Sequence, residues 1–172
     1  LLRLRLGLPL THHQELYPCF FCHRPLADSY GGHALTCMFG GERTRIHGVM
    51  CTVLHRYASE AHFLARREVT VYRGSHSADR IDLVLRGYIP RPAALDFALT
   101  HPLRDTVSSD AAALRPGGAA SAYERTKRLR YADLITDGTF DFIPLIVDTL
   151  GAWGVSSQAY FQKVANAIAR RT

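Results

Sequence analysis

The chain has 172 residues, a hydrophobic fraction of 47% and a formal net charge of +6. This length and apolar content suit one domain, or one domain with a small appendage, and no run of about 18 or more apolar residues predicts a membrane span. Arginine supplies most of the positive charge, because Lys127 and Lys163 are the only lysines, and guanidinium groups suit contact with phosphate. Since the sequence opens without methionine or signal-peptide architecture, we expect a fragment of a longer polypeptide.

Residues 1–43 contain pairs of ligands that are typical of a structural zinc site. Cys19 and Cys22 are separated by two residues, and His33 and Cys37 by three. Zinc binds such pairs tetrahedrally, and the absence of a secretory signal favours metal over disulfides. The alternative is a set of unbound cysteines packed as small hydrophobic side chains. We therefore predict Zn²⁺ in a Cys-Cys-His-Cys knuckle with its linker, followed by a second domain over residues 44–172.

Hydrophobic periodicity predicts that the second domain follows the order helix, strand, strand, strand, helix, strand, helix. The expected helices span residues 44–67, 119–136 and Ser156 or Ser157 (as N-cap) to 170, and the expected strands span 68–72, 80–86, 93–101 and 139–149. Pro144 indicates that the last strand lies at a sheet edge or contains a bulge, because proline cannot donate to the ladder. The order is compatible with a mixed sheet packed between helices, an α/β (α+β) fold.

The first predicted helix carries His47, Cys51 and His55 at positions i, i+4 and i+8, which form a single stripe. These side chains could supply a metal ligand, or the stripe could face the core or a nucleic acid. We prefer the second interpretation. His23 adjoins Cys22 too closely to bind the same ion with it.

Asp82 and Asp96 lie in the second and third predicted strands, on either side of a turn over residues 87–92. If the two strands form an antiparallel hairpin centred near Ile89, these aspartates face each other with Cβ atoms about 4.5–5.5 Å apart. Strand alternation places both on the face opposite the apolar side chains. Carboxylates at that spacing repel unless a cation lies between them, and a hard divalent ion takes oxygen ligands. Two ordinary solvent-facing aspartates are the alternative.

Glu124, Lys127 and Tyr131 lie on one face of the second predicted helix. A two-carboxylate site that cleaves phosphodiesters needs a cation near the attacking water or the phosphate, and Lys127 is a candidate. The alternative is an exposed ion pair between Glu124 and Lys127, and spacing alone does not decide between them. Glu68, at the start of the first strand, is either a third acidic contact or a surface residue.

Taken together, the order and spacing of these residues resemble the restriction-like endonuclease domain of non-LTR retrotransposon polyproteins. Members of that family carry a Cys-Cys-His-Cys knuckle, an Arg-His pair, a Glu-Pro step, an Arg-Pro-Asp motif, a second Asp, a helical Glu-x-x-Lys-x-x-x-Tyr and a closing segment. The matching segments here are the four knuckle residues, Arg45-Ile46-His47, Glu68-Val69, Arg80-Ile81-Asp82, Asp96-Phe97-Ala98-Leu99-Thr100, Glu124 to Tyr131, 142–145 and 151–154. Val69 and Ile81 replace prolines of the family pattern.

The resemblance implies a restriction-endonuclease-like fold, in which an αβββαβα order builds a mixed sheet flanked by helices after the N-terminal knuckle. It implies a PD-(D/E)XK-type enzyme that nicks DNA with Mg²⁺ or Mn²⁺ bound by Asp82 and Asp96, so that target-primed reverse transcription can begin. Its implied partners are DNA, the element RNA and a reverse transcriptase in the same polyprotein, in the nucleus and away from membranes.

The same resemblance assigns roles to individual residues. Asp82, Asp96 and Lys127 are the implied catalytic residues, and Lys127 substitutes for a lysine that related nucleases carry at the position of Ala98. Glu68 and Glu124 are further catalytic candidates, and the candidate DNA contacts are Arg80, Arg128 and Tyr131. The main alternative is a catalytically silent DNA- or RNA-binding module of the same fold, and a zinc-stabilised protein-interaction domain is a further one.

Overall fold

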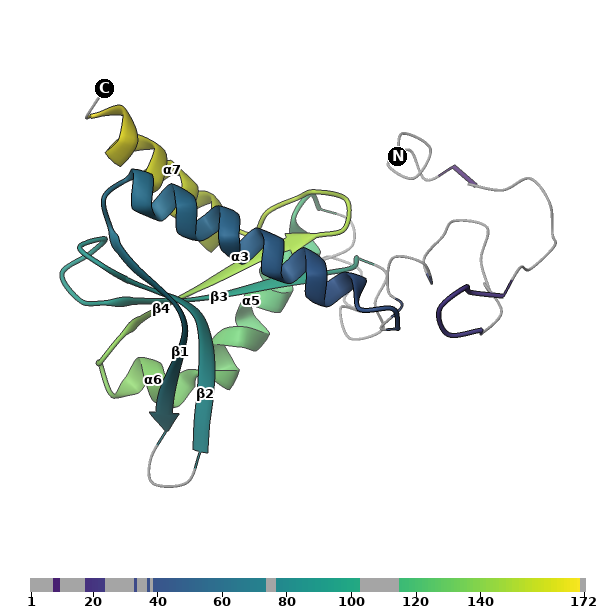
Figure 1. Cartoon of the computed structure of the whole chain (residues 1–172), viewed down its shortest axis with the longest axis horizontal. Helices are drawn as coiled ribbons and strands as arrows, with labels where there is room; N and C mark the ends of the chain where they lie inside the picture. The colour runs from purple at the N-terminus through teal and green to yellow at the C-terminus, as the bar shows by residue number, and fades with distance from the viewer. Residues whose placement is uncertain are drawn as a thin grey trace.

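The structure, a computed structural model, describes residues 8–9, 18–23, 33, 37, 39–73, 77–102 and 115–170. Most of the predicted knuckle-and-linker region lies outside these residues. The described elements confirm the predicted order and add one short helix (Figure 1). They are α3 (Glu42–Glu60), β1 (Leu64–Arg73), β2 (Ser77–Arg86), β3 (Ala93–Thr100), α5 (Gly118–Arg130), α6 (Ala132–Thr136), β4 (Asp141–Asp148) and α7 (Val155–Ala169).

The strands form one mixed sheet in the order β1-β2-β3-β4. β1 pairs with β2, and β2 with β3, in antiparallel register, whereas β3 and β4 run parallel. A parallel pair needs a crossover connection, and the segment that contains α5 and α6 provides it. Among the described strands β4 lies at the sheet edge and contains Pro144, so the edge position predicted from that proline is confirmed.

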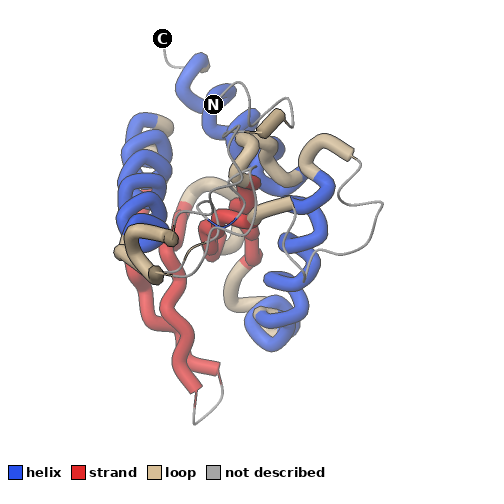
Figure 2. The backbone as a smooth tube through the Cα atoms, turned by 90° about the vertical axis from the view of Figure 1, so that its right-hand side faces the viewer, coloured by secondary structure: helices blue, strands red, loops and turns tan. Residues whose placement is uncertain are grey.

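Helices cover both faces of the sheet (Figures 1 and 2). The larger apolar cluster joins α3 and α7 to β2, β3 and β4, and it buries Leu54, Leu85 and Tyr160 almost completely. The smaller cluster lies on the opposite face, where Tyr131, at the end of α5, packs on Phe142 of β4 with ring centroids 4.5 Å apart. The sheet therefore presents one face to α3 and α7 and the other to α5.

The first helix is shorter than its predicted span of 44–67. α3 ends at Glu60, and the chain turns at His62, whose φ of 59° is left-handed. The backbone N–H of His62 donates to the carbonyl of Ser59 at 2.8 Å and closes the last turn. Ala61 and Leu64 continue the helical period of apolar residues, so periodicity alone extended the helix into what is β1.

Two other boundary predictions were wrong because tertiary contacts decide them. The predicted helix 119–136 breaks at Tyr131 (φ −100°, ψ 23°), whose ring is buried against the sheet. α7 has Gly154 at its N-cap in place of Ser156 or Ser157. The Ser157 hydroxyl instead accepts a hydrogen bond from the backbone N–H of Ile146 in β4, at 2.8 Å, and ties α7 to the sheet.

β2 does not keep a simple alternation along its length. Leu83 belongs to the cluster under α3 and α7, but Ile81 packs in the cluster on the α5 face. The β1–β2 register pairs Arg67 with Leu83 and Val69 with Ile81, and leaves out the pair between them. The omitted pair is Glu68 and Asp82. The φ of Glu68 is 55°, which is left-handed. The prediction that Ile81 and Leu83 share a face was therefore wrong, because the pleat reverses at this level.

Candidate active site and metal-ligating groups

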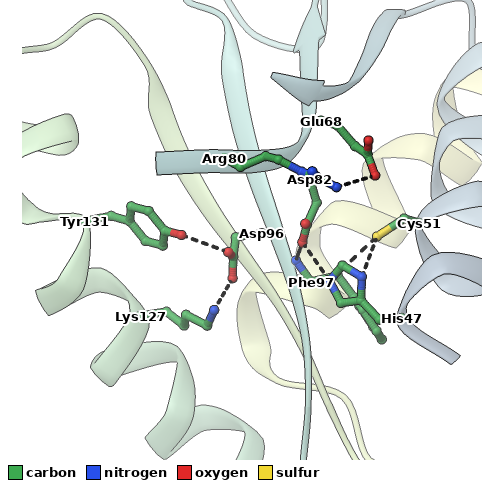
Figure 3. A network of polar contacts seen from close by, with 9 residues as sticks. All are labelled: His47, Cys51, Glu68, Arg80, Asp82, Asp96, Phe97, Lys127 and Tyr131. Carbon is green, nitrogen blue, oxygen red and sulfur yellow. Dashed lines mark hydrogen bonds and ion pairs between the residues drawn. The ribbon is translucent and has the colours of Figure 1, made fainter. Parts of the chain in front are cut away.

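Asp96 lies in β3 and is buried, with its side chain directed toward α5 (Figure 3). The hydroxyl of Tyr131 donates to its Oδ1 at 3.0 Å, and the ammonium of Lys127 lies 2.6 Å from its Oδ2. The Lys127 and Asp96 side chains are only 12% and 7% exposed. Low local dielectric strengthens such a pair, and it also makes either charge costly to leave alone.

Tyr131 and Lys127 reach the same carboxylate because they lie about one helical turn apart at the end of α5. Burial raises the pKa of Tyr131, and the negative charge of Asp96 raises it further. Tyr131 therefore stays protonated and donates. The prediction that Tyr131 contacts DNA was wrong, since its side chain is almost fully buried and its hydroxyl is committed to Asp96.

Asp82 lies where β2 and β3 separate. The β2–β3 ladder ends at the pair Leu83–Leu95, and the Asp82 carboxylate then accepts the backbone N–H of Phe97 through Oδ2, at 2.7 Å. A side chain thus satisfies an amide that a ladder carbonyl would otherwise bind. The same Oδ2 lies 3.1 Å from Nε2 of His47 in α3.

His47 and Cys51 lie one turn apart on α3 and extend the Asp82 contact into a cluster. The Cys51 sulfur lies 3.9 Å from Nε2 of His47, and the ligand atoms of all three residues lie within 4.8 Å of one another. The hydrogen bond to Asp82, followed by the contact with Cys51, raises the pKa of His47 to about 10. The ring of Phe97 packs beside the imidazole, with centroids 5.6 Å apart.

Asp82 and Asp96 do not face each other as predicted. Asp82 engages α3 and the Phe97 amide, whereas Asp96 engages α5 (Figure 3). The cause is the pleat reversal in β2, which turns Asp82 away from the α5 face that Asp96 occupies. The two residues still meet at the same short piece of β3 backbone, because the amide that Asp82 binds follows Asp96 directly in the chain.

Glu124 has a structural position. Its carboxylate accepts hydrogen bonds from the backbone N–H and the hydroxyl of Ser156, both at 3.0 Å. These contacts cap the first turn of α7 from a distance of 32 residues in sequence. A Cβ at position 154 would lie 2.1 Å from Glu124 Oε1, so a side chain there would displace this carboxylate. Glu124 and Lys127 lie on the same helix but have different partners: Glu124 contacts Ser156, whereas Lys127 contacts Asp96.

Glu68 and Arg80 form an ion pair at 2.7 Å across β1 and β2, above Asp82 (Figure 3). Both side chains are largely exposed, at 54% and 67%, so the pair contributes little to stability. Arg128 donates to the carbonyl of Phe142 at 3.3 Å and to the Ser156 hydroxyl at 3.0 Å. Arg80 and Arg128 remain predicted DNA contacts, and Glu68 remains a predicted catalytic residue.

The four knuckle residues come together in the described part of the N-terminal region. The sulfurs of Cys19 and Cys37 are 3.7 Å apart, and the Cys22 sulfur lies 3.1 Å from Nε2 of His33. Two ligands of a tetrahedral zinc ion with Zn–S bonds of about 2.3 Å are separated by about 3.8 Å. The backbone N–H of Cys22 lowers the pKa of the Cys19 thiol to about 6, and a thiolate is the form that binds metal. The group could therefore hold a metal ion, with zinc the ion that suits it. Segments 24–32 and 34–36 lie outside the described residues.

The sequence placed His47 and Cys51 on one stripe of a helix but did not connect them to Asp82. Their i, i+4 spacing was a signal for a shared site. The missing information was the pleat reversal that turns Asp82 toward α3. His55, the third member of the stripe, does not belong to the cluster.

No protein-family model matches the chain, and no curated protein sequence matches it. In the described part of the chain no helix is both long enough and apolar enough to span a bilayer.

Proposed function

We propose that the chain is a metal-dependent DNA endonuclease that nicks target DNA for target-primed reverse transcription of a non-LTR retrotransposon. The observation that carries the proposal is the buried Lys127–Asp96 ion pair, next to the point where β2 and β3 separate around Asp82. We call this point the strand fork and define it by Asp82, Asp96 and Lys127. Two carboxylates that could hold a metal ion, with an ammonium beside them, are groups that metal-assisted phosphodiester hydrolysis can use.

The fold supports this proposal. The order of α3, three antiparallel strands, a helical crossover, a parallel fourth strand and α7 corresponds to the αβββαβα arrangement that the sequence resemblance implies. We therefore propose that the fold is of the restriction-endonuclease type. Fold likeness gives no activity by itself, so the proposal depends on the side chains at the fork.

The donor chemistry at the fork suits Mg²⁺ or Mn²⁺, because both ions prefer carboxylate oxygens. Asp82 Oδ1 has no partner among the described residues, and Asp96 Oδ2 is buried with the Lys127 ammonium beside it. Because the two carboxylates contact different helices, a single ion held by both requires the Asp82 side chain to turn from His47 toward Asp96. When bound, such an ion would polarise the phosphate and lower the pKa of a water.

The chain's own residues prepare the fork for a phosphate. Lys127 neutralises Asp96 in the absence of substrate, and its ammonium is held within reach of any group that replaces that contact. Tyr131 fixes the orientation of the Asp96 carboxylate by donating to Oδ1. Phe97 fixes Asp82 through its amide. These contacts hold the reacting groups in place before substrate arrives, which lowers the cost of orientation.

Arginines are exposed on β2 and α5, which carry fork residues, and on the neighbouring strand β1. These arginines are at positions 66, 67, 80, 86, 125, 128 and 130. Guanidinium groups bind phosphate oxygens with a bidentate geometry, and such contacts supply affinity without sequence readout. DNA is therefore the proposed substrate and partner.

A second candidate function is a silent nucleic-acid-binding module with the same surface. One observation favours it: each aspartate is already satisfied by a different helix. Such a module would retain DNA in the presence of EDTA and would never nick it.

A plasmid-nicking assay separates the two functions. The wild-type chain is incubated with supercoiled DNA and Mg²⁺ or Mn²⁺, and in parallel with EDTA. We expect nicking that depends on the metal and is lost in Asp82→Ala and Asp96→Asn, while gel-shift retention of DNA persists. Asp133→Asn, which changes an exposed aspartate on α6, is the matched control and should nick normally. Nicking at the wild-type rate by either fork variant, or no nicking by the wild type in any divalent ion, contradicts the proposal.

A further inference from the structure

We propose that His47, Cys51 and Asp82 form a second zinc site, distinct from the N-terminal knuckle. The three side chains come from two elements, α3 and β2, that are brought together only by the fold. Their ligand atoms lie within 4.8 Å of one another. The inference depends on this geometry alone and is independent of whether the chain cuts DNA.

The distances agree with a tetrahedral ion. Zinc bonds of about 2.0–2.1 Å to nitrogen or oxygen and about 2.3 Å to sulfur separate a nitrogen and an oxygen ligand by about 3.4 Å, and a nitrogen and a sulfur ligand by about 3.6 Å. In the structure, Nε2 of His47 lies 3.1 Å from Asp82 Oδ2 and 3.9 Å from the Cys51 sulfur, and that sulfur lies 3.7 Å from Nδ1. Because the sulfur is about equally far from both ring nitrogens, the imidazole must turn so that Nε2 points at an ion between the three side chains.

The ligand types select the ion. One imidazole, one thiolate and one carboxylate suit zinc, whereas Mg²⁺ takes oxygen ligands. Cys51 is 4% exposed and lies at the edge of the apolar cluster under α3, where the low polarity around the sulfur strengthens a metal bond. The site would thus hold zinc, and Asp82 would be a ligand that it shares with the ion proposed between the two aspartates.

Neighbouring groups already orient two of the ligands. The Phe97 amide holds Asp82 Oδ2 at 2.7 Å, and the Phe97 ring packs beside His47. Contacts that hold a metal ligand in its binding orientation typically contribute about 10–100-fold in metal affinity. Because one residue supplies both contacts, β3 sets the position of the ion although it contributes no ligand.

Among the described residues the group has three members, which leaves one tetrahedral position for water. Three protein ligands and a water form the arrangement of catalytic zinc ions, whereas structural zinc sites are closed by four. The ion would bind Oδ2 of Asp82, whose Oδ1 has no partner among the described residues. It would also link α3 to β2, because two of its ligands come from α3 and one from β2.

Zinc stoichiometry tests the proposal. The whole chain is loaded with zinc and dialysed against metal-free buffer. The number of zinc ions per chain is then measured by elemental mass spectrometry. We expect two ions in the wild type, one in Cys51→Ala, one in Cys19→Ser and none in the double variant. His55→Ala removes the third histidine of the same helical stripe and is the matched control, with two ions expected.

Cys51 is buried, so each variant is checked by circular dichroism, and His47→Gln provides a second variant at a half-exposed position. Co²⁺ titration gives an independent readout, since a thiolate ligand adds charge-transfer absorption that Cys51→Ala should lose in a Cys19→Ser background. A wild type that binds one ion, lost in Cys19→Ser, overturns the proposal. So does a wild-type zinc content in both Cys51→Ala and His47→Gln. Neither readout involves DNA, so the result is separate from that of the nicking assay.

Discussion

The two aspartates of the strand fork meet at one piece of β3 backbone, because Asp82 binds the amide that follows Asp96, but their surroundings differ. On the α5 side, Asp96 is buried and its charge is neutralised inside the protein by Lys127 and Tyr131. On the α3 side, Asp82 is 18% exposed and shares its Oδ2 with a half-exposed histidine and an amide. One carboxylate is therefore part of a buried ion pair, whereas the other is partly exposed and has one oxygen, Oδ1, without a partner among the described residues.

The sharpest way to break this comparison is to remove the cation on the α5 side. Lys127→Met leaves Asp96 charged and buried, and breaking a buried pair in this manner costs about 3–5 kcal/mol. Denaturant unfolding should show this loss, and nicking should disappear. Adding Asp96→Asn removes the stranded charge, so the double variant should regain most of the stability without regaining nicking. Equal stability of Lys127→Met and wild type would show that the pair is solvated and the two sides are alike.

Tyr131→Phe weakens the same side by one hydrogen bond. A hydrogen bond to a charged group contributes about 1.5–3 kcal/mol, and this loss should appear at neutral pH. The pKa of Tyr131 is raised in the folded state, whereas an unfolded tyrosine titrates near pH 10. The contribution of Tyr131 is therefore present below about pH 10 and declines above it, so unfolding curves of variant and wild type should converge in alkali. A difference that grows above pH 10 contradicts the assignment.

On the α3 side the corresponding change is His47→Gln, measured in EDTA. The pKa of His47 is raised to about 10 by Asp82, above the ordinary value of about 6.5. The ion pair therefore stabilises the fold fully below pH 6.5 and is lost as pH rises through 10. His47 is 40% exposed, so solvent screening limits the effect to about 1 kcal/mol or less. Unfolding at pH 6 and pH 10 checks this, and an equal difference at both values argues against the pair.

The smallest effect is expected from Tyr160→Phe. Tyr160 lies in α7, away from both aspartates. The Tyr160 hydroxyl is buried without a hydrogen-bond partner in the described part of the chain, so its removal relieves a desolvated polar group. Stability should stay within about 0.5 kcal/mol of wild type, or rise. A loss of stability as large as that expected for Tyr131→Phe would contradict this. It would show that removing a tyrosine hydroxyl reports on packing and not on the Asp96 contact.

Much of the architecture was predictable from local pattern. The order of strands and helices and the grouping of Lys127 with Tyr131 follow from periodicity. The edge position of β4 follows from Pro144, which has no N–H to donate. The knuckle ligands were also predictable, because their spacing is set by short turns. These features depend on residues close together in the chain.

What sequence reasoning missed depends on long-range contacts. The face to which Asp82 points is decided by the left-handed φ of Glu68 on the neighbouring strand, a conformation that a glutamate rarely adopts. The capping role of Glu124 depends on a helix that begins 32 residues later. Both effects are decided by tertiary packing, so periodicity assigned Asp82 to the wrong face and left Glu124 among the catalytic candidates.

The hydrogen bond from the Phe97 backbone to Asp82 gives the protein a built-in spectroscopic probe. In solution NMR, the chemical shift of that amide proton reads the charge on the carboxylate that it faces, and its neighbour Asp96 lies on the same peptide. A titration with zinc or magnesium followed at this single cross-peak would therefore report which ion reaches the aspartate first, without a substrate or a substitution.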